Sequence, residues 1–280
     1  MGHTAIAADR AARTRILLAR ATRHITRTLI TSTAAISVPP MARGLLRWPI
    51  RTLHAETTQL VNLVYRRWRR DGVKGFTLTI AAAATVSLLA VLNHVHASQG
   101  VLRGCCGERA DLSPWLAVAR LPGSLFAPSP LLPAWGSILQ VVVVAALAEA
   151  AVGRLKAGVV ALAGHSLATA SAHVFLWLGP TAPLGLNDSW RRALDTGPSA
   201  ATLALAAYLA VVVTAPLLGS ALTALTVIAS LTMPGLAGTE HLIALTVGLS
   251  CGAIHLAALR WRVGTATLNG VDMEVSVSRR

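Results

Sequence analysis

Apolar residues in this chain fall into long, nearly continuous runs, unlike the short alternating or amphipathic patterns of a soluble protein. A helix needs about 20 mostly apolar residues to cross a hydrocarbon core about 30 Å thick. Six runs reach or approach that length, the fifth being the shortest. The pattern therefore predicts membrane-spanning helices at residues 75–95, 133–151, 157–178, 198–215, 217–233 and 240–259.

Composition agrees with a membrane protein. Hydrophobic residues make up 54% of the chain and charged residues 13%, and the mean hydropathy is +0.60. We predict an all-α membrane protein whose six-helix transmembrane domain occupies residues 75–260. A basic amphipathic cytoplasmic segment is expected at 1–74, with a membrane-surface helix at 9–37, and a polar C-terminal tail at 261–280.

Lysine and arginine are distributed unequally along the chain. With six spans and the N-terminus inside, 20 of the 25 lie on the cytoplasmic side and five lie outside. Cytoplasmic flanks of membrane helices carry the excess of basic residues, so both termini are expected in the cytoplasm and the protein in the plasma membrane. Arginine outnumbers lysine 23 to 2 and alanine is abundant, which is typical of a GC-rich bacterial genome.

The net charge of +14 is compatible with two kinds of partner, nucleic acid and anionic lipid. Most of the charge precedes the first predicted span. There the run at residues 65–70, Tyr-Arg-Arg-Trp-Arg-Arg, is suited to attract anionic headgroups and to fix the topology. We therefore expect membrane lipid as a partner and no nucleic acid.

Two polar residues, Ser199 and His241, stand where predicted spans begin on the same side of the membrane. They are 42 residues apart, about two spans with their connections, so the fourth and sixth helices can present them at similar depth. A serine hydroxyl becomes a nucleophile when a neighbouring base accepts its proton, and neutral imidazole is the usual base. Ser199 and His241 are therefore the candidate catalytic pair.

Small residues recur along one face of each of these helices, and such stripes let membrane helices approach closely. The stripes continue from His241 to Ala244, Gly248 and Gly252, and from Ser199 to Thr202 and Ala206. Close packing of the two stripes could bring the serine and the histidine within hydrogen-bonding range. The structural alternative is that Ser199 only caps its helix, because Gly-Pro-Ser is a common helix start.

These features resemble the rhomboid family of intramembrane serine proteases. That family has six core spans, a catalytic serine in Gly-x-Ser-Gly at the outer end of the fourth, and a catalytic histidine that begins the sixth. Gly197-Pro198-Ser199-Ala200 is similar to the serine motif, with Ala200 in place of the usual glycine. The helix that follows His241 is similar to the histidine helix. The resemblance covers residues 75–259 and implies a Ser199–His241 dyad that cleaves transmembrane segments of other proteins.

Residues in the predicted second span and in the loop before it match the rhomboid family only in part. Glu149 and Gly153 match a glutamate and a glycine of the family. The family's Trp-Arg motif is half present, at Arg120, and Pro133 and Ser137 replace the histidine and asparagine that help to form the oxyanion hole. Losing one oxyanion donor costs about 100- to 1000-fold in turnover. Ser137 can still donate through its hydroxyl, whereas Pro133 can donate nothing.

Two functional interpretations therefore stay open. One is an active intramembrane serine protease. The other is a catalytically inactive rhomboid-like protein that binds transmembrane helices of client proteins. A small transporter, with Glu149 as proton carrier, is a further alternative that would need paired polar groups or discontinuous helices.

Other motifs are weaker. Residues 164–168, Gly-His-Ser-Leu-Ala, look like a lipase nucleophile elbow but lie in an apolar helix instead of a strand–turn–helix. His165 and His173 lie near one face of the third span and are expected to form buried hydrogen bonds between helices. Glu149 is more simply explained as a packing polar group or a partner of Arg154 than as a proton carrier.

Histidine and cysteine also gather around the first outer loop, at His94, His96, Cys105 and Cys106. These are ligand types for zinc or copper, yet their spacing matches no recognised framework. Adjacent cysteines rarely bridge each other, so no disulfide framework follows from them and Cys251. We predict no bound metal and no cofactor.

Overall fold

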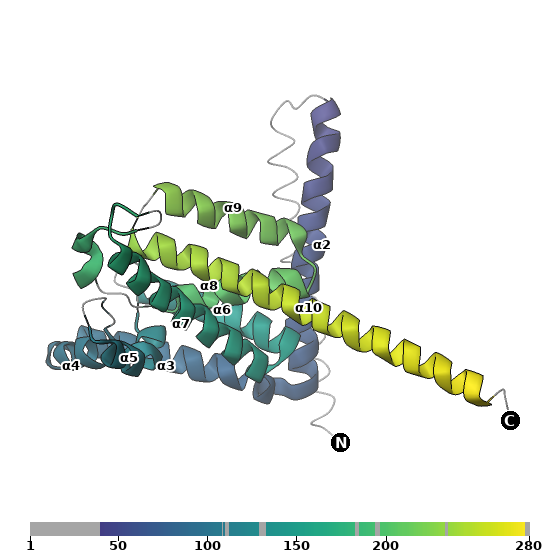
Figure 1. Cartoon of the computed structure of the whole chain (residues 1–280), viewed down its shortest axis with the longest axis horizontal. Coiled ribbons are helices and arrows are strands. Elements are labelled where there is room, and N and C mark those ends of the chain that lie inside the picture. The colour runs from purple at the N-terminus through teal and green to yellow at the C-terminus, as the bar shows by residue number, and fades with distance from the viewer. Residues whose placement is uncertain are drawn as a thin grey trace, which may run out of the picture. The chain divides into compact units, whose positions relative to one another are not determined.

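Figure 1 shows the computed structural model of the chain, which describes residues 40–107, 109, 112–128, 133–182, 185–193, 197–232 and 235–277. The helix predicted at 9–37 lies outside these residues. The chain divides into two units, Met1–Thr58 and Gln59–Arg280. In the first unit, residues 40–58 are helical.

All regular elements among the described residues are helices. In chain order they are α2 (Pro40–Asp71), the short 3-10 helix η1 (Gly72–Phe76), α3 (Thr77–His94), α4 (His96–Cys106), α5 (Pro114–Phe126), α6 (Ala134–Val152), α7 (Arg154–Leu178), the 3-10 helix η2 (Asp188–Arg192), α8 (Ser199–Val212), α9 (Pro216–Thr232) and α10 (Leu236–Val277).

Each predicted span overlaps one helix, α3 or one of α6 to α10; the boundaries are similar except at the end of α10, which extends 18 residues beyond the predicted span. Among the described residues, four helical stretches are long and apolar enough to cross a membrane: Trp48–His94, Ala134–Val152, Arg154–Leu178 and Leu236–Arg262. The other two candidates, α8 and α9, are shorter apolar helices. The part of the chain that the structure describes is therefore all-helical, and the protein is membrane-embedded.

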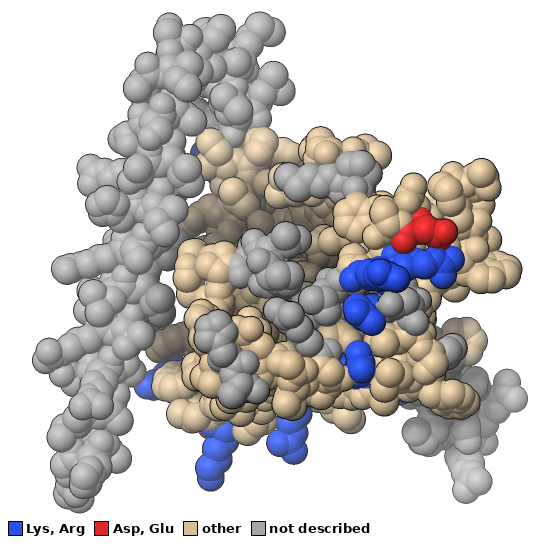
Figure 2. All heavy atoms as spheres, turned by 90° about the vertical axis from the view of Figure 1, so that its left-hand side faces the viewer, with Lys and Arg blue, Asp and Glu red and all other residues tan. Residues whose placement is uncertain are grey.

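The surface supports this conclusion. On the face shown in Figure 2, charged side chains of the described residues gather in small areas, and most of the surface is uncharged. Large apolar side chains are exposed on several helices. Trp115 is 86% exposed and Trp177 is 79% exposed, as expected for residues that face lipid and not water.

Two regions are more regular than the sequence indicates. The long connection after the first span contains two helices, α4 and α5. The last helix continues without a break from Leu236 to Val277, so the boundary expected at residue 261 is not marked by a helix end.

Glu149, near the end of α6, holds the beginning of α3. The residue before α3 is Phe76, whose side chain cannot accept a hydrogen bond from the first N–H groups of the helix. The Glu149 carboxylate accepts from the backbone N–H of Leu78 at 3.1 Å and of Thr79 at 2.9 Å, and from the Thr79 hydroxyl at 3.0 Å. The structure thus favours a packing role for Glu149.

The α8 helix lies at the centre of the bundle, between α7 and α10, and most of its residues are buried. Glycines allow this packing. A Cβ atom at Gly248 would lie 2.8 Å from Ala207 Cβ, and one at Gly252 would lie 2.7 Å from Val211 Cβ. Both distances are shorter than real side chains show, so α10 approaches α8 closely only because these residues have no side chain.

The direction of the helices follows from their contacts. Gly248 lies against Ala204 and Gly252 against Tyr208, so contact positions rise together along α8 and α10 and the two helices are parallel. Gly164 of α7 also lies against Ala204, and four residues further along α7 Ala168 packs with Ala200, so α7 runs antiparallel to α8 and α10.

Candidate functional site

Ser199 is the first residue of α8, and that helix is too short to cross a membrane alone. Its 14 residues extend about 21 Å, against about 30 Å of hydrocarbon. Ala200 packs in one cluster with Ala168 of α7 and Ala244 of α10. From that level α7 continues ten residues to Leu178, and α10 begins eight residues earlier. Ser199 is therefore recessed by about 12 to 15 Å from the ends of both neighbours.

His241 lies near the same level. Contacting residues of α8 and α10 are 44 positions apart, as the Gly248–Ala204 and Gly252–Tyr208 contacts show. By this register His241 is level with Gly197, about 3 Å along the helix axis from Ser199. Both candidate residues are half-buried.

The described hydrogen bonds do not include one between Ser199 and His241. The carbonyl oxygen of Ser199 accepts from the Thr202 hydroxyl at 3.0 Å. On α10 the residue one turn before Ala244 along the contact stripe is Glu240, which is only 6% exposed. The structure thus adds a buried carboxyl group beside His241, which the sequence analysis did not single out.

The first turn of α8 offers backbone donors at this level. Thr202 N–H is bonded to Pro198 O at 2.8 Å, and Pro198 provides no side-chain cap. The N–H groups of Ser199, Ala200 and Ala201 therefore have no acceptor within the helix. Together with the helix dipole, these groups favour negative charge at the start of α8.

Ser137 of α6 lies at the level of Ser199 as well. Gln140 Nε2 donates to the Thr202 hydroxyl, and further along Ala148 and Leu209 share one cluster, so α6 and α8 are parallel. Ser137 precedes Gln140 by three residues, as Ser199 precedes Thr202. The Ser137 side chain is fully buried, and its hydroxyl has no hydrogen-bond partner among the described residues.

A buried Ser–His contact does exist, but it involves other residues. Ser124 Oγ of α5 lies 2.9 Å from His165 Nε2 of α7, and both side chains are almost fully buried. The Ser124 carbonyl accepts from the N–H of Gly197, two residues before Ser199. This contact joins helices far apart in the sequence, as expected for His165, and fastens the segment that leads into α8.

A second polar group lies at the opposite end of α8. Tyr208 OH is 2.5 Å from His255 Nδ1 of α10, and His255 Nε2 is 3.4 Å from Lys156 Nζ of α7. These contacts tie the three central helices together on the side away from Ser199.

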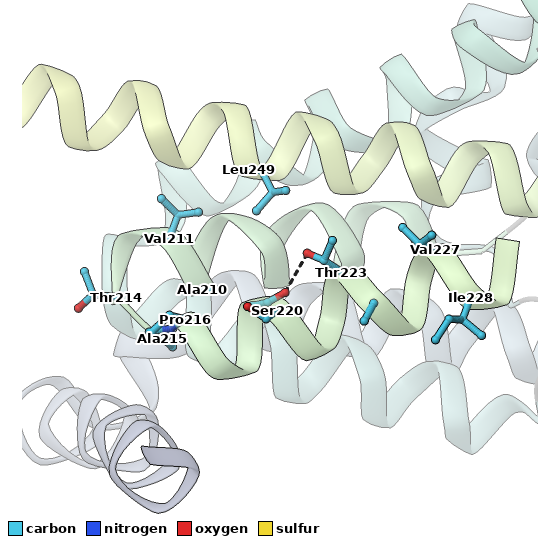
Figure 3. A pocket seen from close by; sticks show the side chains of 12 residues that line it. Ala210, Val211, Thr214, Ala215, Pro216, Ser220, Thr223, Val227, Ile228 and Leu249 are labelled. Atoms are coloured by element: carbon cyan, nitrogen blue, oxygen red, sulfur yellow. Dashed lines mark hydrogen bonds between the residues drawn. The ribbon is translucent and has the colours of Figure 1, made fainter. Parts of the chain in front are cut away.

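Figure 3 shows an apolar groove of about 880 Å³ between α8, α9 and α10. Thr226 is the only buried residue that α9 contributes, so this helix is loosely packed. Because Gly219 lies against Ala210 and α9 is antiparallel to α8, Ile228 is near the level of Ala201. The groove therefore extends to within about one turn of Ser199. Its lining includes Ala210, Val211, Thr214, Ala215, Pro216, Gly219, Ser220, Thr223, Ala224, Val227, Ile228 and Leu249.

Residues 164–168 lie within α7, and no strand accompanies them among the described residues. Arg120 Nη1 donates to the carbonyl of Gly107 at 3.0 Å. The part of the chain that the structure describes contains no group of three or more His, Cys, Asp or Glu residues able to hold a metal ion.

Comparison of the chain with protein-family models, with curated proteins and with solved structures finds no match. The resemblance to rhomboid proteases therefore stands on the residues of this chain.

Proposed function

We propose that this protein is a rhomboid-like intramembrane serine protease that cleaves transmembrane segments of other proteins. The observation that supports this most is the recessed start of α8. It places a serine about 12 to 15 Å below the ends of the neighbouring helices, level with His241. An ionisable side chain such as that of His241 is costly at that depth and is by default a candidate for function.

In the proposed reaction Ser199 Oγ attacks the carbonyl carbon of a peptide bond while the His241 imidazole accepts the hydroxyl proton. The resulting imidazolium then donates that proton to the leaving amine, and water hydrolyses the acyl-enzyme by the same route. The reaction requires a Ser199–His241 hydrogen bond, which the described contacts do not include. Such contacts are often longer before substrate is bound.

The developing oxyanion needs donors, and Pro133 supplies none. The first N–H groups of α8 and the unpaired Ser137 hydroxyl lie at the level of Ser199 and are the candidates. The apolar groove beside α9 would accept an apolar segment from the lipid, which fits a transmembrane substrate.

We further propose a plasma-membrane location with six spans and both termini in the cytoplasm, supported by the charge distribution. In that orientation the start of α8 faces the outside, and the basic N-terminal segment contacts anionic headgroups.

A fluorophosphonate probe tests the reaction, because it forms a covalent adduct with an activated serine. We expect labelling of the wild type, loss of labelling in Ser199→Ala and His241→Ala, and retained labelling in Ser166→Ala, which changes a half-buried serine elsewhere in the bundle. Equal labelling of the wild type and Ser199→Ala would show that Ser199 is not the nucleophile.

The second candidate function is a catalytically inactive rhomboid-like protein that binds transmembrane helices. It is favoured by Pro133 directly before α6, because proline has no N–H to donate to an oxyanion. In that case the folded protein would not react with the probe. Photo-crosslinking to transmembrane clients in the cell would be the same for the wild type and Ser199→Ala.

A further inference from the structure

The two adjacent cysteines that end α4 form a contact that the proposed function does not use. Cys105 Sγ lies 3.1 Å from Cys106 Sγ. Cys105 is exposed and Cys106 is buried. We propose that Cys105 and Cys106 form a reversible thiol–disulfide modification site whose oxidation alters the packing of the segment that leads into α8. This inference does not depend on protease activity.

The geometry favours a reversible bond. Disulfide-bonded cysteines normally have Cα atoms about 4.4–6.8 Å apart, whereas consecutive Cα atoms are about 3.8 Å apart. A bond between these neighbours is therefore strained, and strained, exposed disulfides are the easily reduced, regulatory kind. The pair lies in the last turn of α4, directly before the extended Gly107. Only that turn must unwind to form the ring.

The chemistry balances with a disulfide-bearing oxidant. The thiolate of exposed Cys105 attacks the oxidant and forms a mixed disulfide, releasing one thiol. Cys106 then attacks Cys105 Sγ and releases the second thiol. The two cysteines lose two electrons, and the oxidant's disulfide is reduced to two thiols that take up the protons.

The order of attack follows from the surroundings. Burial, and then the hydrogen bond and charge of Cys105, raise the pKa of the Cys106 thiol to about 11. Once Cys105 is in a mixed disulfide, the two effects that come from its own thiol disappear. Cys106 is then left with burial as the main obstacle to ionisation.

A short chain of contacts connects the pair to Ser199. A Cβ atom at Gly123 of α5 would lie 2.9 Å from Cys106 Sγ and 2.8 Å from the Cys105 carbonyl oxygen. The end of α4 is thus packed tightly on α5. The next residue, Ser124, accepts the Gly197 N–H hydrogen bond at 3.1 Å. Unwinding the last turn of α4 therefore displaces α5 near Ser124, whose carbonyl binds the segment that leads into α8.

Mass spectrometry and hydrogen exchange test the proposal. All proteins carry Cys251→Ser, so that Cys105 and Cys106 are the remaining cysteines. After treatment with oxidised glutathione we expect a mass loss of about 2 Da in the peptide with both cysteines, reversed by dithiothreitol. The Gly197 amide hydrogen should exchange with solvent about fivefold faster. Loss of one ordinary hydrogen bond changes an equilibrium constant by about that factor.

Two variants serve as controls. Cys105→Ser should show neither the mass loss nor the faster exchange. Gly123→Ala, which disturbs the same contact without oxidation, should speed exchange at Gly197 in the reduced protein. No mass loss, bonds only between molecules, or unchanged Gly197 exchange in the oxidised protein would each overturn the proposal. Probe labelling of Ser199 is not needed, so failure here is separate from failure of the proposed protease.

Discussion

Replacement of Gly248 by alanine tests the packing that positions Ser199 against α10. The added Cβ atom would lie 2.8 Å from Ala207 Cβ and 2.9 Å from the Ala204 carbonyl carbon, and closer still to the Ala204 oxygen. The obstacle is largely backbone, so rotation of a side chain cannot relieve it. The helices must separate by about 1 Å to restore ordinary contact distances of about 3.5–4.0 Å.

Overpacking of this kind lowers the free energy of unfolding by about 1–3 kcal/mol. The higher helix propensity of alanine offsets up to about 1 kcal/mol of that loss. We therefore expect Gly248→Ala to lower the free energy of unfolding by about 1–2 kcal/mol. The matched control is Gly158→Ala in α7, because a Cβ atom there would have no heavy atom within 4 Å. It should leave stability unchanged or slightly higher.

The assay is unfolding in mixed micelles by titration with a denaturing detergent, followed by far-ultraviolet circular dichroism. If Gly248→Ala is as stable as Gly158→Ala, α8 and α10 do not pack as described here, and the register that levels His241 with Gly197 is wrong.

Four further outcomes are expected. Gly164→Ala should be destabilised by about 1–3 kcal/mol and largely rescued by Ala204→Gly, because the two Cβ atoms would compete for one space; additive losses in the same titration would contradict this. Glu149→Gln should lower the free energy of unfolding by about 1–3 kcal/mol, since the carboxylate accepts two backbone N–H groups at the start of α3; unchanged stability would refute that role. At pH 8 iodoacetamide should modify Cys105 before Cys106, as mass spectrometry of tryptic peptides can show. The raised pKa of Cys106 should also make stability fall as pH rises from 9 to about 11, because the unfolded thiol ionises first.

The sequence predicts the helices well because lipid imposes one simple requirement, a continuous apolar stretch. It also predicts that Gly248 and Gly252 pack closely against a neighbouring helix, because small residues four positions apart let membrane helices approach each other. The face of α8 that receives them was not predicted correctly in detail. Ala204 and Tyr208 make the contact, whereas the expected stripe ran through Thr202 and Ala206.

Contacts between distant elements could not be predicted from local patterns. Nothing near Ser124 in the sequence indicates His165, which lies 41 residues away on another helix. Glu149 holds the start of α3 because Phe76 cannot cap it, and that requirement becomes visible only when both helix ends are known. The depth of Ser199 likewise depends on the lengths of α7 and α10 beside it, a property of three packed helices and not of any motif.

The depth of Ser199 is the most direct test of the proposed site. Single cysteines at positions 199 and 177, in a background without the three native cysteines, can carry spin labels in lipid bilayers. Collision with oxygen and with a water-soluble nickel complex then reports depth. We predict that position 199 lies more than about 10 Å deeper than position 177, near the end of α7. Equal depths would contradict a serine recessed in the membrane, and with it the proposed intramembrane site.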